Sequence, residues 1–375
     1  MNEKQRLKEL AQLFLKLGII GFGGPAAHIA MMQNEVVVKR KWLDEQHFLD
    51  LLGATHLIPG PNSTEMAIHI GHERAGVKGL IVSGLCFILP AVFITGFFAW
   101  LYKAYGQLPE IQPFLYGIKP AIIAIILGAI FPLAKKSFKT IPLTFIGIIV
   151  LVLSLLQFNE IALLFGAGFL SLFWFSIQNK NSVQRNWISL GILPASQTTL
   201  AAVSNWNLFL IFLKIGAILY GSGYVLFAFL DAELVAKGLL SRTELIDAIA
   251  VGQFTPGPVF SSVTFVGYQM NGFSGAAVST LAIFLPSFVF VALLNPLVKT
   301  LRNSKSFSVF LDAVNVSSVA IIISICIQMG AETITDWRTI LIAIISMIVA
   351  FYYRKINSAF IVLGGAFLGY ILGLF

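Results

Sequence analysis

The segment His56-Leu-Ile-Pro-Gly-Pro-Asn-Ser-Thr-Glu65 places two prolines and a glycine inside an otherwise apolar, helix-forming region. Proline removes a backbone donor and clashes with the preceding turn, and glycine tolerates unusual backbone angles. A related segment, Gln253-Phe-Thr-Pro-Gly-Pro-Val-Phe-Ser-Ser262, sets Pro256 197 positions after Pro59. The sequence therefore predicts two interrupted helices at equivalent places in the chain.

Matching segments on both sides of these breaks predict an internal repeat. Phe14-Leu-Lys-Leu-Gly18 returns as Phe212-Leu-Lys-Ile-Gly216, 198 positions later. Gly-rich segments follow both copies, and glycine pairs with an offset of 196 follow both breaks. We predict a first repeat over residues 1–178, a connecting segment over 179–205 and a second repeat over 206–375.

The composition predicts an all-α, polytopic membrane protein. Hydrophobic residues make up 57% and charged residues 11% of the chain, where soluble domains average about 25% charged. Apolar runs such as Gly79–Leu101 and Phe114–Ala134 are long enough to cross about 30 Å of hydrocarbon. The lipid bilayer is thus the expected partner, and a multi-pass protein of the cytoplasmic membrane without a cleavable signal is the expected location.

The net charge of +8 fits basic loops beside anionic lipid, so no nucleic-acid partner is expected. Cys86 and Cys326 stand alone in apolar segments without metal-ligand spacing. We therefore expect no metal and no cofactor.

The charges of the loops predict that the two repeats have inverted topology. The loop with Lys135, Lys136 and Lys139 is basic, whereas its counterpart around Glu332 and Asp336 is acidic. Lys and Arg concentrate on the cytoplasmic side, so homologous loops face opposite sides. Inversion requires an odd number of crossings before residue 206, supplied either by Trp187–Val203 or by one of the broken elements.

The breaks predict anion sites, because the first amides of a helix lack acceptors and carry the positive end of the helix dipole. At the first break we expect Gly60 as the N-cap and Pro61 as the first residue of the helix. We expect the two helix starts to approach each other near mid-membrane, and the alternative is a pair of proline kinks without a ligand. The candidate substrate-binding residues at the two breaks are Gly60, Asn62, Ser63, Thr64, Gly257, Ser261 and Ser262.

Two lysines and the Gly-rich segments extend this candidate site. Lys16 and Lys214 share one repeat position in apolar surroundings, which is costly unless the amine is paired, hydrated or snorkelling. They are interpreted as positive charges on an anion path, while snorkelling, or pairing with a carboxylate such as Glu65, remains open. The Gly-rich segments add the following candidates: Gly23, Gly24, Pro25, His28, Gly221 and Ser222.

The proton-binding candidates Glu65, His28 and His69 all lie in the first repeat, and the second repeat has no histidine. A buried Glu or His can take up a proton and couple transport to a proton gradient. The alternative is that His56, His69 and His72 lie at interfacial depth with hydrogen bonds and without any coupling role.

At these residues the chain resembles the chromate ion transporter family, in its long form with two fused chromate-transport domains. The matching motifs are Phe22-Gly-Gly-Pro25, Pro59-Gly-Pro-Asn62 and Phe87-Ile-Leu-Pro90, and the likeness covers nearly the whole chain. The resemblance implies chromate export across the cytoplasmic membrane, driven by the membrane potential or proton gradient and sometimes linked to sulfate. The second half departs from it at Tyr220-Gly-Ser-Gly223 and lacks counterparts of His28 and Glu65.

We therefore predict a secondary transporter, an antiporter for a tetrahedral oxyanion, chromate with a sulfate link, working as an efflux system on the proton motive force. A transporter for sulfate or another small anion on the same scaffold, or an anion channel, is the alternative. An enzyme is disfavoured because no nucleophile–base spacing occurs, and ATP-driven transport because no phosphate-binding loop occurs. A homodimer remains open.

Overall fold

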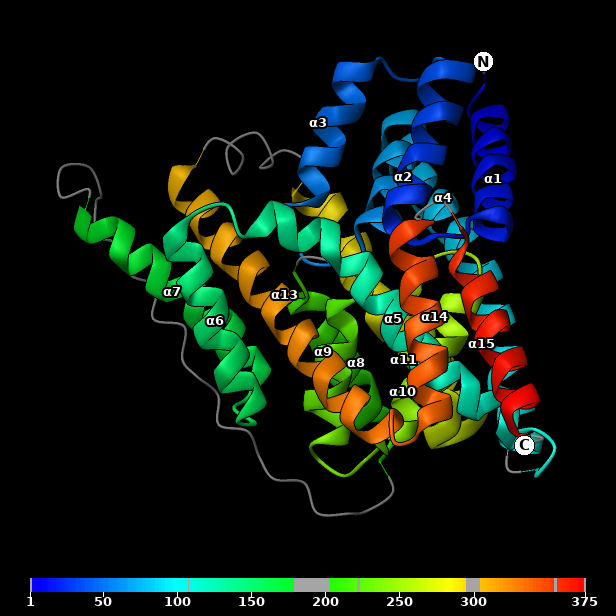
Figure 1. Ribbon diagram of the computed structural model, residues 1–375. Helices are drawn as coiled ribbons and strands as arrows, with labels where there is room; N and C mark the ends of the chain where they lie inside the picture. Colours follow the sequence, from blue (N-terminus) through cyan, green and yellow to red (C-terminus); the bar gives the residue numbers. More distant parts are fainter. Residues whose placement is uncertain are drawn as a thin grey trace.

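The computed structural model describes residues 2–106, 108–178, 203–220, 223–294, 304–353 and 356–373 (Figure 1). Within these ranges the secondary structure is helical throughout, without a strand. The predicted connecting segment, including most of Trp187–Val203, lies outside the described residues.

Both halves contain the same succession of short, long and short helices. The first half has α1 (Glu3–Ile20), α2 (Gly24–Gln33), η1 (Asn34–Lys39), α3 (Glu45–Thr55), α4 (Asn62–Tyr105), α5 (Gln112–Ser137), α6 (Ile141–Leu155) and α7 (Glu160–Gln178). The second has α8 (Asn205–Ile218), α9 (Val225–Leu230), η2 (Asp231–Val235), α10 (Arg242–Phe254), η3 (Val259–Ser261), α11 (Ser262–Leu294), α13 (Lys305–Thr333), α14 (Trp337–Tyr352) and α15 (Ser358–Gly373). The segments η1 and η2 are π-helical, and η3 is a 3₁₀ turn.

Polar caps fix where several helices begin. The Asp44 carboxylate accepts the His47 amide at the start of α3. Ser241 and Glu244 form a reciprocal capping box at the start of α10. These caps satisfy amides that have no acceptor inside the helix, so α3 and α10 begin at matching places in the two repeats.

The helices α4 and α11 each fold back on themselves near their first third. Gly76 has φ of 58° and Gly272 has φ of 62°, a left-handed conformation that glycine adopts without steric cost. In a straight helix Gly71 and Ser83 would lie about 18 Å apart along the axis. In the structure a Cβ added to Gly71 would lie 2.7 Å from the Ser83 Cβ, so the two arms of α4 pack side by side.

The first arm of α4 pairs with α3 to form a helical hairpin. Lys78 at the fold-back pairs with Glu3 at the start of α1, with a nitrogen–oxygen distance of 2.9 Å. Beside them His47 of α3 lies 3.3 Å from Glu73 of α4. Since the start of α3 and the end of this arm meet at one surface, the break at Pro59–Pro61 forms the tip of the hairpin inside the protein.

The two halves meet through a reciprocal pair of backbone hydrogen bonds. The Gly60 N–H donates to the Leu219 carbonyl at 2.8 Å, and the Gly257 N–H donates to the Gly21 carbonyl at 2.7 Å. Residues 21 and 219 differ by 198 positions, the same offset that relates Lys16 to Lys214. Each break therefore contacts the end of the first helix of the other repeat, as a local two-fold relation requires.

The described chain contains five helical stretches that are long and apolar enough to cross a membrane: Asn62–Tyr105, Gln112–Ser137, Glu160–Ile177, Val259–Leu293 and Lys305–Thr333. Large apolar side chains such as Phe93 and Phe273 are exposed on the outside, as expected for a surface in lipid. The prediction of an all-α, multi-pass membrane protein with two repeats and interrupted helices is confirmed. Inverted topology stays a prediction.

Figure 1 shows how the two sets of short helices are distributed. The helices α1, α2 and α3 gather at the end of the molecule where the N-terminus lies, and α8, α9 and α10 lie toward the opposite end. The helix α13 runs through the interior, with 78% of its most apolar stretch buried, which is the largest share among the five stretches.

Candidate functional site: a lysine-lined cavity beside a buried acid

A cavity of about 740 Å³ lies among α2, α3, α5, α9 and α13. Lys135, Lys136 and Lys139 line it at the end of α5, and all three are exposed, so this side of the cavity reaches the protein surface. Its other polar lining residues are His56, Asn62, Ser137, Asp312, Asn315 and Ser318. Three cations face one carboxylate, which favours an anionic ligand.

Helix starts add to this positive field. Pro25, the second residue of α2, and Asn62, the first residue of α4, both line the cavity. The positive ends of two helix dipoles therefore point toward it. The Asn62 side-chain amide lies 3.0 Å from the His56 Nδ1, and the Lys139 amine donates to Asp312 at 2.9 Å. Lys135 and Lys136 lie outside this ion pair.

The first break differs in one detail from the sequence prediction. Pro61, and not Gly60, is the N-cap of α4, and the Thr64 amide donates to the Pro61 carbonyl at 2.8 Å. The Thr64 amide is thus already used by the helix, which leaves the amides of Asn62 and Ser63 as candidates. The Thr64 hydroxyl is buried without a hydrogen-bond partner among the described residues.

The second break does not line this cavity. The Ser261 amide donates to the Pro258 carbonyl at 2.9 Å, and the Ser262 hydroxyl donates to the Val259 carbonyl at 2.7 Å. Gly257 packs against Ala91, whose Cβ would lie 2.9 Å from an added Cβ. The structure therefore brings Asn62 to the cavity but not Gly257, Ser261 or Ser262. The polar groups of Ser261 and Ser262 are used in hydrogen bonds within the second break itself.

His28 connects the two breaks. Its Nε2 lies 2.9 Å from the Gly21 carbonyl, which also accepts the Gly257 amide, and its Nδ1 lies 3.4 Å from the Ser63 hydroxyl. Because a carbonyl can only accept, Nε2 carries the proton and Nδ1 is left to accept from Ser63. The residue 198 positions later is Leu226, so this link exists only on the first-half side.

Glu65 is a buried carboxyl group one turn into α4. Its Oε1 accepts from the Ser287 hydroxyl at 3.5 Å, and its Oε2 has no partner within the described part of the chain. His69, four residues on, is also buried, and neither ring nitrogen has a hydrogen-bond partner there. Residues four apart share a helix face, so Glu65 and His69 form a buried titratable column directed toward His72 and Glu73 at the fold-back.

The two predicted lysines are paired with carboxylates. Lys16 lies 3.3 Å from Glu35, and Lys214 lies 2.5 Å from Glu233. The partner of Lys16 is therefore not Glu65, because the chain folds back after α1 and brings Glu35 beside it. Both lysine side chains are about half exposed, and neither lines the cavity.

Sequence reasoning missed these glutamates, although a signal was present. Glu35-Val-Val-Val-Lys39 and Glu233-Leu-Val-Ala-Lys237 are repeats of each other, again offset by 198. In both copies the second lysine also contacts the glutamate, at 3.0 Å and 2.5 Å. The duplicated clusters fasten η1 and η2 to the first helix of their own repeat.

The Gly-rich segments fall beside the same region. Gly23 lines a smaller cavity of about 350 Å³ that shares Pro25 and Lys136 with the larger one. Gly24 faces the Tyr224 hydroxyl, which lies 3.4 Å from an added Cβ. The predicted residues Gly221 and Ser222 lie outside the described residues.

Comparison with known proteins finds that two segments of the chain match the same protein family. The family described as Chromate transporter matches residues 8–172 and again 206–370. The chromate transport protein of Cupriavidus metallidurans is 31% identical over 97% of this chain and 93% of its own length. The probable chromate transport protein of Synechococcus elongatus is 30% identical over 97% of this chain and 95% of its own.

A more distant relative is an uncharacterized transporter of Methanocaldococcus jannaschii, 28% identical over 96% of this chain and 92% of its own. No solved structure matches the chain.

Proposed function

Because the chain belongs to the chromate transporter family, whose members are membrane transport proteins, we propose that it is a secondary transporter for chromate or a similar tetrahedral dianion. The observation that carries this proposal is the charge of the cavity: three lysines and two helix starts line it, together with a single carboxylate. Coulomb attraction is proportional to the charge of the ligand, so a doubly charged oxyanion gains about twice as much from these cations as a monovalent anion.

The distribution of charge supports entry from the cytoplasm and therefore efflux across the cytoplasmic membrane. The exposed lysines at the mouth of the cavity mark the cytoplasmic side under the positive-inside rule. The opposite placement of α1–α3 and α8–α10 in Figure 1 supports inverted repeats, in which a second opening forms on the other side.

The driving force for efflux of a dianion is chiefly electrical. The membrane potential contributes about 2.3 kcal/mol per elementary charge per 100 mV, so a dianion leaving a negative interior gains about 4.6 kcal/mol per 100 mV. Glu65 and His69 are proposed to add sensitivity to pH, with His28 setting the local hydrogen bonds. An ionised Glu65 repels an anion held at the start of its own helix, so protonation of Glu65 favours anion binding.

Flux into proteoliposomes tests the substrate and the driving force. We expect saturable chromate flux that sulfate inhibits and that an imposed potential accelerates. Equal flux of all anions, or more than about 10⁴ ions per second per protein, would indicate a channel, because alternating access requires microsecond-to-millisecond motions. Absence of chromate flux with rapid flux of another anion would assign a different substrate.

A matched pair of variants tests the buried acid. Glu65→Gln keeps the size of the side chain but binds no proton, so flux should lose its response to a pH gradient and keep its response to potential. Glu110→Gln removes an exposed carboxylate outside the spanning helices and should leave both responses intact. A Glu65→Gln protein with a normal pH response would remove Glu65 from the coupling mechanism.

A further inference from the structure

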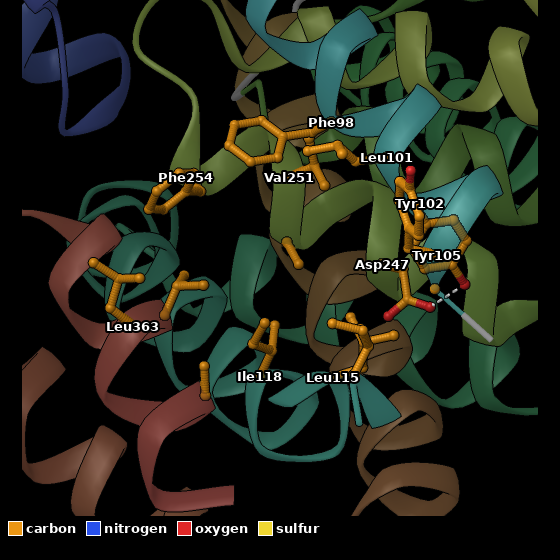
Figure 2. Close-up of a pocket in the computed structure, with 15 residues that line it drawn as sticks. Phe98, Leu101, Tyr102, Tyr105, Leu115, Ile118, Asp247, Val251, Phe254 and Leu363 are labelled. Carbon is orange, nitrogen blue, oxygen red and sulfur yellow. Dashed lines mark hydrogen bonds between the residues drawn. The ribbon is translucent and has the colours of Figure 1, made fainter. Parts of the chain in front are cut away.

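A second pocket, of about 430 Å³, lies among α4, α5, α10 and α15 (Figure 2). It shares no lining residue with the lysine-lined cavity. Apolar side chains form nearly all of its wall, including Phe98, Leu101, Ile118, Val251 and Phe254. Its size and lining are those of sites for small organic molecules and not those of an inorganic oxyanion site.

One carboxylate interrupts this apolar wall. Asp247 of α10 is 2% exposed, and its Oδ2 accepts the Tyr102 hydroxyl at 2.7 Å. Its Oδ1 has no hydrogen-bond partner among the described residues. Figure 2 shows the Asp247 oxygen without a partner on the pocket side, turned away from the hydrogen bond with Tyr102. A buried carboxylate oxygen without a partner is costly, so the site lacks a hydrogen-bond donor.

Burial raises the pKa of Asp247, and Glu244 one turn away on α10 raises it further, while Lys119 of α5 and the Tyr102 hydroxyl lower it. A cationic group beside the carboxylate also lowers this pKa and so stabilises the ionised acid. The remaining ionisable side chains on the wall are the phenols of Tyr102 and Tyr105. The missing donor is therefore expected to be cationic and to carry an apolar group that fills the rest of the pocket.

The rim of the pocket reaches the outer surface of spanning helices. Tyr105 at the end of α4 and Leu363 of α15 are about half exposed. A molecule dissolved in the hydrocarbon of a bilayer can thus enter from the side, without passing through the lysine-lined cavity. The half-exposed phenol of Tyr105 at this rim also attracts ammonium groups.

We propose that this pocket binds a lipophilic ammonium ion. Its ammonium group donates to the Asp247 Oδ1, and its alkyl chain packs against the wall formed by Phe98, Val251 and Phe254. Helices from both repeats form the pocket, so a bound ligand holds α10 of the second repeat against α5 of the first. The site is independent of the identity of the transported anion.

Three probes with one alkyl chain test the proposal: octylammonium, octanol and octanoate. Binding of tritiated octylamine is measured on the purified full-length protein in lipid nanodiscs, with protein-free nanodiscs subtracted. We expect octylammonium to bind about tenfold more tightly than octanol, as a charge-assisted hydrogen bond predicts, and octanoate to compete least.

Asp247→Asn should lower the affinity for octylammonium about tenfold and leave competition by octanol unchanged, which also shows that the pocket remains folded. Asp50→Asn is the matched control, because Asp50 holds the equivalent position in the first repeat and does not line this pocket. Equal affinities for octylammonium and octanol in the unmodified protein would indicate a site for lipid tails and overturn the proposal. Absence of saturable binding would overturn it as well.

Discussion

Replacing Gly60 by alanine tests whether the first break must keep its present backbone shape. Gly60 has φ of 140°, in a region that L-residues rarely adopt. An added Cβ would lie 2.6 Å from the Ser287 hydroxyl and closer still to the Glu65 carboxylate. Alanine therefore strains the backbone and displaces the buried acid at the same time.

The size of the effect follows from these contacts. Holding alanine at this φ costs about 1–3 kcal/mol. If the loop moves to relieve the strain, the hydrogen bond from the Gly60 amide to Leu219 is lost instead, at a cost of about 0.5–1.5 kcal/mol. The two responses are alternatives, so we expect the free energy of unfolding to fall by about 1–3 kcal/mol.

The assay combines denaturant unfolding in detergent micelles with chromate flux in proteoliposomes, normalised to folded protein. Gly166→Ala is the control, because no atom lies within 4 Å of an added Cβ there. Its helix should gain up to about 1 kcal/mol from the higher helix propensity of alanine. A Gly60→Ala protein with unchanged stability and unchanged flux would refute the reasoning about the break.

Three further changes test other parts of the structure. Glu35→Gln should lower the free energy of unfolding by about 1–3 kcal/mol, because it leaves several cations without their buried carboxylate. Lys16→Gln should lower it by under about 1 kcal/mol, because that lysine is half exposed. The thermal midpoints of the two variants in detergent test this difference. Lys136→Gln should raise the KM for chromate several-fold and flatten its dependence on salt, measured by flux at two ionic strengths, and an unchanged salt dependence would argue against the cavity. Gly71→Ala should destabilise the fold-back of α4 by about 1–3 kcal/mol, since the added Cβ would overlap the opposite arm of the helix. In Gly330→Ala the added Cβ meets no atom within 4 Å, so this control should not destabilise the protein. Equal melting temperatures of the two variants would contradict the packing of the two arms.

Several features of the fold could be read from the chain because their causes are local. Apolar runs long enough to cross a bilayer mark the spanning helices. The segments Pro59–Pro61 and Pro256–Pro258 interrupt helices through the steric effects of proline on its own turn. The duplicated Phe-Leu-Lys motif at Phe14–Lys16 and Phe212–Lys214 defines the repeat without any knowledge of packing. Hydropathy and proline sterics depend only on neighbouring residues, and identity between the two repeats can be read by comparing segments without knowing how they pack.

The candidate site was anticipated only in part. Asn62 and Pro25 line the cavity, and Glu65 is buried beside them. Gly76 and Gly272 share the offset of 196 positions, but the sequence does not indicate that α4 folds back sharply at Gly76. Helix propensity cannot distinguish a continued helix from one that turns back on a glycine with positive φ.

Residue type and spacing alone indicate a membrane protein of two repeated halves with interrupted helices, since burial in lipid and helix interruption act locally. Packing of distant segments sets the pairing of Lys16 with Glu35, the hydrogen bonds within the second break, and the cavity that lysines at the end of α5 share with the start of α4. These outcomes depend on distances between residues far apart in the chain, which packing of the two halves sets and no local pattern encodes.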